Sequence, residues 1–161
     1  MINPIDSNDI RNIIEKKYKP PAYLTLFEVR SVTGFSIRER YADVIVFSMW
    51  PSNGLTITGI EIKVTRQDLL HEIKRPEKSR AIKRFCDYWW LCTPLTLRTD
   101  GLEIPEDWGV MKFSKQKIVE VKRKAPKLEA EPMTKSFLFS CMRSANRSSI
   151  DKVERYIREI R

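Results

Sequence analysis

Three charged side chains in the first half of the chain have types and a spacing that could carry out chemistry together: Asp43, Glu61 and Lys63. Glu61 and Lys63 are two residues apart, so on a strand they project from the same face. Two carboxylates that lie close together repel each other unless a cation sits between them. Mg²⁺ or Mn²⁺ suits such a pair, because these ions take oxygen ligands and keep waters for a substrate phosphate. The backbone carbonyl of Ile62 could add a further oxygen.

A lysine beside such a metal has a clear chemical use. Lys63 could orient and help deprotonate an attacking water, or stabilise charge that develops on phosphorus. The chain has one histidine and three widely spaced cysteines, so we expect neither a histidine-rich site nor a zinc site nor a disulfide framework. These residues favour phosphodiester hydrolysis that relies on carboxylates, lysine and a metal. A surface salt bridge between Glu61 and Lys63 is the alternative, and Asp43 weighs against it because a charge within an apolar strand needs a reason.

Two predicted strands would bring the three residues together. Residues 41–50 are β-branched and aromatic, and residues 59–64 alternate between apolar and polar, which predicts strands over 41–50 and 55–64. Pro51-Ser52-Asn53-Gly54 between them is a turn signal. If the strands pair antiparallel about this turn, the numbers of facing residues sum to about 104 or 105. With a sum of 104, Asp43 lies opposite Glu61, and their Cβ atoms are about 5 Å apart.

The pattern elsewhere predicts helices around these strands. Ser7 can cap a first helix that ends before Pro20-Pro21, and apolar spacing predicts a second helix from about Ala22 to Val32. Residues 65–68 are typical of a capping box that opens a helix, which Pro76 interrupts and restarts. The apolar residues 88–92 predict a strand that is buried on both faces, with Trp89 and Trp90 in the core.

The last third of the chain predicts a hairpin followed by two helices. Residues 108–113 and 118–121 are the expected hairpin strands, and one helix spans about 134–145. Ser148 would cap the last helix, on which one stripe carries apolar side chains: Ile150, Val153, Ile157 and Ile160. A length of 161 residues suits one domain over 1–161, with a core over about 22–94 and the hairpin and helices over 105–161.

The charge of the chain favours a polyanionic partner. The formal net charge is +9, and two stretches hold much of the basic excess. Residues 74–84 contain six lysines and arginines, and residues 112–127 contain seven against a single glutamate. Such stretches suit nucleic acid, because lysine and arginine release counterions from phosphates. Solvated surface charge is the alternative.

The order of the predicted elements resembles a known family. A helix, a strand with Asp43, a strand with Glu61-Ile62-Lys63, a helix and a strand are similar to the αβββαβ core of the PD-(D/E)XK nucleases. Residues 40–44, 59–64 and 86–91 resemble segments of small phage and bacterial DNA-repair nucleases of this superfamily, within a region of likeness over about 27–94. The proline of the motif name is absent, since Ala42 precedes Asp43. The resemblance implies a restriction-endonuclease-like α/β fold with a mixed central sheet flanked by helices.

The resemblance also implies further site residues. Such families often carry an acidic residue on the first core helix, and Glu28 matches that position as a third metal or water ligand, with an ordinary exposed glutamate as the alternative. The helix after the lysine often contacts substrate, which makes Lys78, Arg80, Arg66 and Gln67 candidate DNA-binding residues. Arg38 and Arg40 could likewise meet the phosphate backbone or pair with neighbouring acids.

We therefore expect a Mg²⁺- or Mn²⁺-dependent deoxyribonuclease that acts in DNA repair, recombination or phage DNA processing. Two alternatives stay open: a nucleic-acid-binding module that has the nuclease fold without activity, and a basic structural or interaction protein. The sequence has no apolar run of membrane-spanning length and no apolar leader, so we expect a cytoplasmic protein, in the host cytoplasm if phage-encoded. A homodimer is also open, because small nucleases that cut both strands commonly dimerise.

Overall fold

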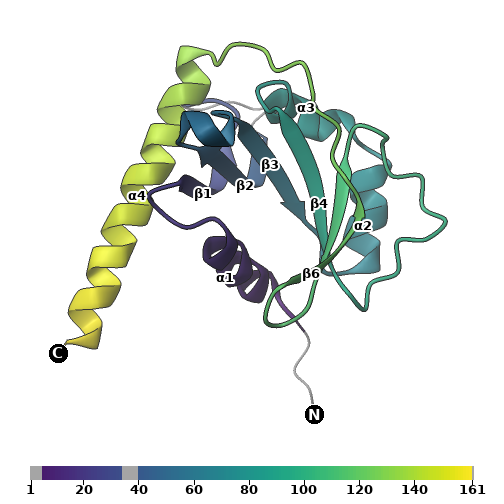
Figure 1. The fold of residues 1–161 in the computed structure, drawn as a ribbon, viewed down its shortest axis with the longest axis horizontal. Helices are drawn as coiled ribbons and strands as arrows, with labels where there is room; N and C mark the ends of the chain where they lie inside the picture. The colour runs from purple at the N-terminus through teal and green to yellow at the C-terminus, as the bar shows by residue number, and fades with distance from the viewer. Residues whose placement is uncertain (1–4, 34–39, 161) are drawn as a thin grey trace.

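A mixed sheet forms the centre of the structure, a computed structural model that describes residues 5–33 and 40–160 (Figure 1). Its six strands lie side by side in chain order. They are β1 (Tyr23–Arg30), β2 (Tyr41–Ser48), β3 (Ile57–Ile62), β4 (Tyr88–Pro94), β5 (Gly109–Phe113) and β6 (Ile118–Arg123). Pairing is antiparallel from β1 to β3, parallel from β3 to β5, and antiparallel between β5 and β6. The predicted α/β class with a mixed central sheet is therefore confirmed.

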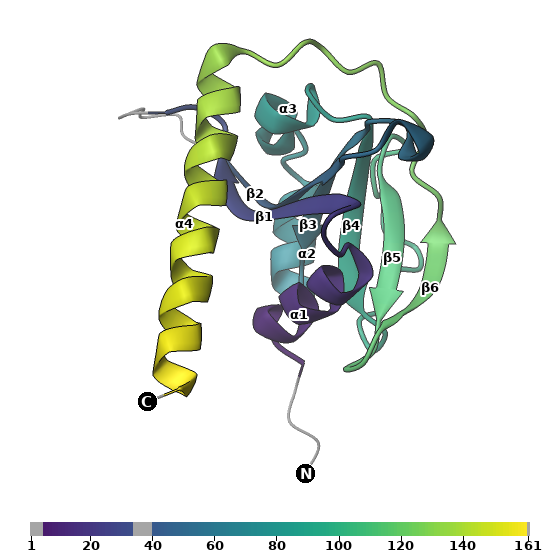
Figure 2. The same cartoon turned by 60° about the vertical axis from the view of Figure 1, so that its left-hand side comes forward.

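Helices cover both faces of this sheet. They are α1 (Ser7–Lys17), α2 (Arg66–Ile73), α3 (Glu77–Lys83) and α4 (Lys135–Glu159), with a short 3₁₀ turn η1 (Pro51–Asn53). One face packs on α1 through residues such as Ile10, Ile14 and Ile60. The other packs on α2, α3 and the first part of α4, and Figure 2 shows α1 and α2 on opposite sides of the strands. Within the described residues, no helix is both long and apolar enough to cross a membrane.

The β2–β3 hairpin has the register that places the candidate residues together. Val44 faces Ile60 and Val46 faces Thr58, so the numbers of facing residues sum to 104, as predicted for one of the two registers. The η1 turn joins the strands and ends at Gly54, whose φ of 86° lies in the left-handed region that glycine tolerates. The strand expected over 88–92, the hairpin of β5 and β6, and the Thr65 cap of α2 are also confirmed.

The helix predicted from Ala22 to Val32 is wrong, because these residues form β1. The segment is rich in β-branched and aromatic side chains, which favour strands. Its apolar residues follow neither the helical period of 3.6 residues nor the strand period of two residues closely, so their spacing does not distinguish the two structures. Pairing with β2 along seven residue pairs decides the outcome. Phe27 packs on the face covered by α1, whereas Val29 packs on the other face. The face changes at Glu28, whose φ is 52°, and this irregularity is what disguised the strand.

Two predicted helix ends are also wrong. The first helix is capped by Asp6 rather than Ser7, in a reciprocal capping box with Asp9. The two closing helices are one continuous helix, α4, without a break at Ser148. Next to Ser148, the Ser149 hydroxyl donates to the carbonyl of Ala145 one turn earlier, a bond by which a helix accommodates serine in its interior.

Close packing of β3 on β4 explains one glycine. Gly59 faces Trp89 across the parallel pair, and Trp89 is fully buried. A Cβ atom at position 59 would lie 2.2 Å from two carbons of the Trp89 ring. Because the indole is surrounded by core side chains, it cannot yield easily.

We expect Gly59→Ala to destabilise the fold by about 2 kcal/mol or more, since it over-packs the core beside β3. Urea denaturation followed by far-UV circular dichroism measures this loss. In a Trp89→Leu background the cost of the same alanine should fall clearly, because the colliding ring is gone. An equal cost in both backgrounds would contradict the packing explanation.

Candidate active site

Asp43 lies where β2 and β3 separate. The paired residues of the two strands end at Val44 and Ile60, and beyond them the Asp43 Oδ2 accepts a hydrogen bond of 2.7 Å from the Ile62 amide. Val44 and Ala42 pack on opposite faces although they are two residues apart, so β2 also changes face at Asp43. In regular pairing the Ile62 amide would donate to a backbone carbonyl of β2. Here it donates to the Asp43 carboxylate instead, which explains a charged residue within an apolar strand.

Lys63 connects three carboxylates at this point. Its Nζ lies 3.0 Å from Glu61 Oε2, 3.4 Å from Glu72 Oε2 and 3.9 Å from Asp43 Oδ2. The lysine side chain is 16% exposed, and those of Glu61, Glu72 and Asp43 are 7%, 12% and 34% exposed. The structure therefore brings together Asp43, Glu61 and Lys63, as the strand register predicted.

Glu72 was not among the residues proposed from the sequence. It lies on α2, three residues after the buried Leu69, so helical spacing places it beside the inner face of the helix. Its place on the inner side of the helix that directly follows Lys63 was the only sign in the sequence that Glu72 could join the site. What sequence alone lacks is the docking of α2 against the sheet, which turns this carboxylate toward Lys63.

Burial and mutual repulsion shape the electrostatics of the cluster. Burial raises the pKa of Glu61 well above its usual value, and the Asp43 carboxylate raises it further, while Lys63 opposes both. Burial alone would lower the pKa of Lys63, but Glu61, Asp43 and Glu72 together outweigh it and raise that pKa above its ordinary value. Three carboxylates therefore surround one ammonium.

The donor set fits a hard divalent cation. Asp43 and Glu61 supply carboxylate oxygens to the lining of one pocket, and three acidic side chains there face a single lysine. The amide of Ile62 already points toward Asp43, and in a strand its carbonyl points to the same side. Among the described residues, no group of three histidine, cysteine or acidic side chains is arranged as a preformed metal cage.

The cluster opens into a cavity of about 220 Å³ that also holds two predicted DNA contacts, Arg40 and Lys78. Lys78 lies on α3, with its Nζ 3.1 Å from the His71 Nε2. The lining comes from β2, β3, α2, α3 and the residues next to the two strands: Arg40, Tyr41, Asp43, Glu61, Lys63, Glu72, Lys78 and Ser79. Cationic side chains thus stand beside the carboxylates.

The other predicted DNA contacts do not line this cavity. The Arg66 Nη1 donates to the carbonyl of Arg98, and Gln67 is exposed in the first turn of α2. Arg80 lines a separate cavity with Lys83 and Asp107. Arg38 lies outside the described residues.

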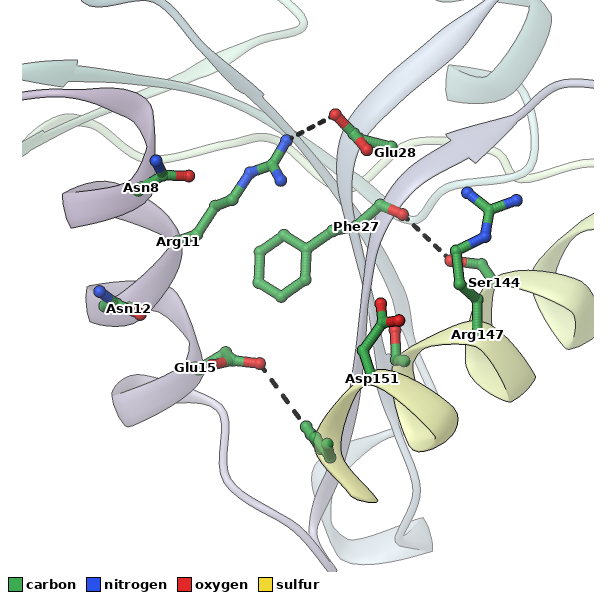
Figure 3. A pocket seen from close by; sticks show the side chains of 11 residues that line it. Asn8, Arg11, Asn12, Glu15, Phe27, Glu28, Ser144, Arg147 and Asp151 are labelled. Atoms are coloured by element: carbon green, nitrogen blue, oxygen red, sulfur yellow. Dashed lines mark hydrogen bonds and ion pairs between the residues drawn. The ribbon is translucent and has the colours of Figure 1, made fainter. Parts of the chain in front are cut away.

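Glu28 is not part of the cluster, and its predicted place on a core helix is wrong. It lies on β1, and its carboxylate pairs with Arg11 of α1 at 2.9 Å (Figure 3). Both residues line a cavity of about 450 Å³ between α1 and α4, in which Ser144 of α4 donates to the carbonyl of Phe27. In a regular strand Glu28 would lie opposite Asp43. Because the backbone of Glu28 is left-handed, its side chain points instead toward Arg11 of α1.

Part of the second basic stretch has a structural role. Lys112 is 2% exposed, and its ammonium donates to the Thr93 hydroxyl and the carbonyl of Leu97. Arg123 donates to the backbone carbonyls of Trp108, Ile104 and Pro105. Lys112 and Arg123 thus hold loops in place by bonds within the fold. Fewer of the seven cations in this stretch are therefore available to bind a polyanion.

Comparisons with known proteins bear on the fold alone. No family model and no curated protein matches the chain. A solved structure, the SPO1766 protein of unknown function from Silicibacter pomeroyi, is similar with a TM-score of 0.59 and 15% sequence identity, over 92% of this chain and 86% of that chain. Likeness at this identity indicates a shared architecture, and function must be argued from the site.

The raised pKa of Glu61 predicts a gain in stability when its charge is removed. Between its ordinary value of 4.5 and its raised value, the folded protein binds more protons than the unfolded chain, so stability falls as the pH rises. We expect Glu61→Gln in EDTA to stabilise the fold by about 1 kcal/mol at pH 8, with a smaller gain near pH 5, since Lys63 keeps two carboxylate partners. Urea denaturation at both pH values measures this difference. The exposed Glu103→Gln should show no such gain, and a destabilised Glu61→Gln at pH 8 would contradict the assignment.

Proposed function

We propose that this protein is a metal-dependent deoxyribonuclease that hydrolyses DNA phosphodiester bonds. The observation that carries the proposal is the Lys63 ammonium held among Asp43, Glu61 and Glu72, where β2 and β3 separate. A buried excess of carboxylates costs stability, and such costs are typical of functional sites rather than of structural ion pairs. A surface salt bridge, the alternative for Glu61 and Lys63, is not supported, because both side chains are largely buried.

The order of elements supports the same reaction. A helix, three antiparallel strands, a helical segment and a parallel strand follow one another from α1 to β4. This order is similar to the αβββαβ core of the PD-(D/E)XK nucleases, with β1 as the strand that the sequence interpretation lacked. Asp43 lies on β2, and Glu61-Ile62-Lys63 follows at the end of β3 and just beyond it; this order is similar to that of the superfamily's motif and supports the proposal.

Asp43 and Glu61 would hold Mg²⁺ or Mn²⁺, with the Ile62 carbonyl as a further oxygen. When bound, such an ion neutralises phosphate oxygens and lowers the pKa of a coordinated water. In the hydrolysis, the water oxygen bonds to phosphorus and the bond from phosphorus to the leaving sugar oxygen breaks. The proton of the water passes to solvent, and the leaving oxygen takes one up.

The protein side chains have distinct tasks in this reaction. Lys63 can donate to a phosphate oxygen and so stabilise the charge that develops on phosphorus. Glu61 and Glu72 fix its ammonium by contacts of 3.0 and 3.4 Å, so its position is set before substrate arrives. The hydrogen bond from the Ile62 amide holds the Asp43 carboxylate in place. Arg40 and Lys78 line the same cavity and can contact the phosphates on either side of the scissile bond.

The first test is cleavage of labelled single-stranded, duplex, nicked and branched DNAs, with RNA alongside, in Mg²⁺, Mn²⁺ or EDTA. We expect cleavage of DNA that EDTA abolishes, and a loss of about 10²-fold or more in Lys63→Ala and Asp43→Asn, since each removes charge stabilisation at the reacting phosphate. Lys83→Ala is the matched control, because Lys83 is also 16% exposed and ion-paired but lies in another cavity. Circular dichroism confirms that each variant is folded.

Two results would overturn this function. A folded wild type that cleaves no nucleic acid in either metal would favour the inactive binding module, provided that it binds DNA with a steep dependence on salt. Variants of Lys63 and Asp43 that cleave as fast as wild type would place the reaction elsewhere in the chain. Cleavage of RNA but not of DNA would show that the protein is a ribonuclease and not a deoxyribonuclease.

A second prediction concerns Glu28, which the resemblance had suggested as a ligand. Its side chain is 59% exposed and paired with Arg11 in the cavity between α1 and α4. We expect Glu28→Gln to retain cleavage within about twofold of wild type, because it removes no group from the Lys63 cluster. Cleavage rates measured at saturating Mg²⁺ test this point, and a loss as large as that of Asp43→Asn would return Glu28 to the site.

A further inference from the structure

Helix α4 has an apolar face that nothing in the described chain covers. Its inner side packs on the sheet through Phe137 and Cys141, and Ser144 donates to β1. Its outer side faces away from the rest of the molecule (Figure 2) and carries six large apolar side chains that are 42–66% exposed. These form the outer stripe: Phe139, Met142, Ile150, Val153, Ile157 and Ile160. A surface helix normally has polar side chains opposite its packed face.

The outer stripe runs straight along the helix axis and is interrupted once, at Asn146 between Met142 and Ile150. Phe139 and Ile150 are eleven residues apart, as are Met142 and Val153, and an 11-residue spacing returns to nearly the same side of an α-helix. At 1.5 Å per residue, the stripe is about 32 Å long. Its last four members follow the 3-4-3 spacing of side chains that pack between two helices. The pattern therefore fits a second helix lying along α4.

The exposed area matches what a stable dimer needs. With roughly 200 Å² for a fully exposed large apolar side chain, the outer stripe and the adjoining Leu138 leave on the order of 700 Å² in water. The largest apolar patch on a monomeric protein is about 300–600 Å². A standard interface buries about 800 Å² on each partner. The outer stripe and Leu138 alone therefore supply most of the area that one partner of a standard interface buries.

We propose that the outer stripe of α4 is a homodimerisation surface on which the same stripe of a second copy packs in parallel. The argument for a second copy is Asn146, an exposed amide in the middle of the stripe. Between Met142 and Ile150, an unrelated apolar partner would leave this amide unsatisfied. In a parallel pair it meets its own copy, and an amide can donate and accept at once.

The fold leaves room for this pairing. The outer stripe lies opposite the face of α4 that packs on the sheet, so the two sheets would lie on the far sides of the helix pair. The cavity that holds Lys63 is lined by β2, β3, α2 and α3 and uses no residue of α4. Dimerisation and cleavage can therefore succeed or fail independently.

The test is the mass of the full chain in solution without DNA. Sedimentation equilibrium should give about 38 kDa for the wild type, twice the chain mass of 19.0 kDa. Val153→Glu/Ile157→Glu should give a folded monomer, because it sets carboxylates within the interface. Arg158→Glu is the matched control, since it changes the net charge by the same two units at a side chain that is 80% exposed off the stripe. It should stay dimeric.

A cysteine at the end of the stripe tests the parallel arrangement. Ile160→Cys should form an intermolecular disulfide under mild oxidation, because parallel helices bring each residue beside its copy. Arg158→Cys should not, and the three native cysteines are buried. A wild type that stays monomeric at 100 µM, or a dimer that survives Val153→Glu/Ile157→Glu, overturns the proposal. A dimer in which Ile150→Cys cross-links and Ile160→Cys does not overturns the parallel arrangement.

Discussion

The Lys63 ammonium is the interaction on which the candidate site depends. Burial and the nearby Asp43 carboxylate raise the pKa of Glu61, and the charge of Lys63 is the contribution that opposes them. The three acidic side chains, Asp43, Glu61 and Glu72, all lie within 3.9 Å of this one ammonium. A cluster arranged in this way is poorly suited to stability and well suited to the uptake of a cation, which is why we regard it as functional.

The strands place this cluster through two local constraints. The separation of β2 from β3 frees the Ile62 amide, and the Asp43 carboxylate takes it, so the position of Asp43 is fixed by the backbone of the neighbouring strand. Two residues before Glu61, the absence of a side chain at Gly59 lets Trp89 close the core against β3. The position of the acids is therefore set by packing as well as by hydrogen bonding.

Sequence reasoning succeeded where the information was local. The turn at 51–54 determines the register of the hairpin, and the register determines that Asp43, Glu61 and Lys63 meet. It failed where distant parts of the chain decide the outcome. Glu72 joins the site only because α2 docks on the sheet, and β1 is a strand because it pairs with β2. Glu28 lies elsewhere because its own backbone turns to a left-handed conformation, which its residue type does not announce.

The left-handed backbone of Glu28 has a consequence for the solubility of the protein. β1 is an edge strand, and a flat edge offers unpaired amides and carbonyls on which another chain can add a strand and aggregate. The change of face at Glu28 interrupts that edge at the sixth of its eight residues, and the Ser144 hydroxyl of α4 donates to the carbonyl of Phe27 just before it. The irregularity that made the strand hard to recognise in the sequence thus hinders a strand of another chain from pairing with the edge of β1.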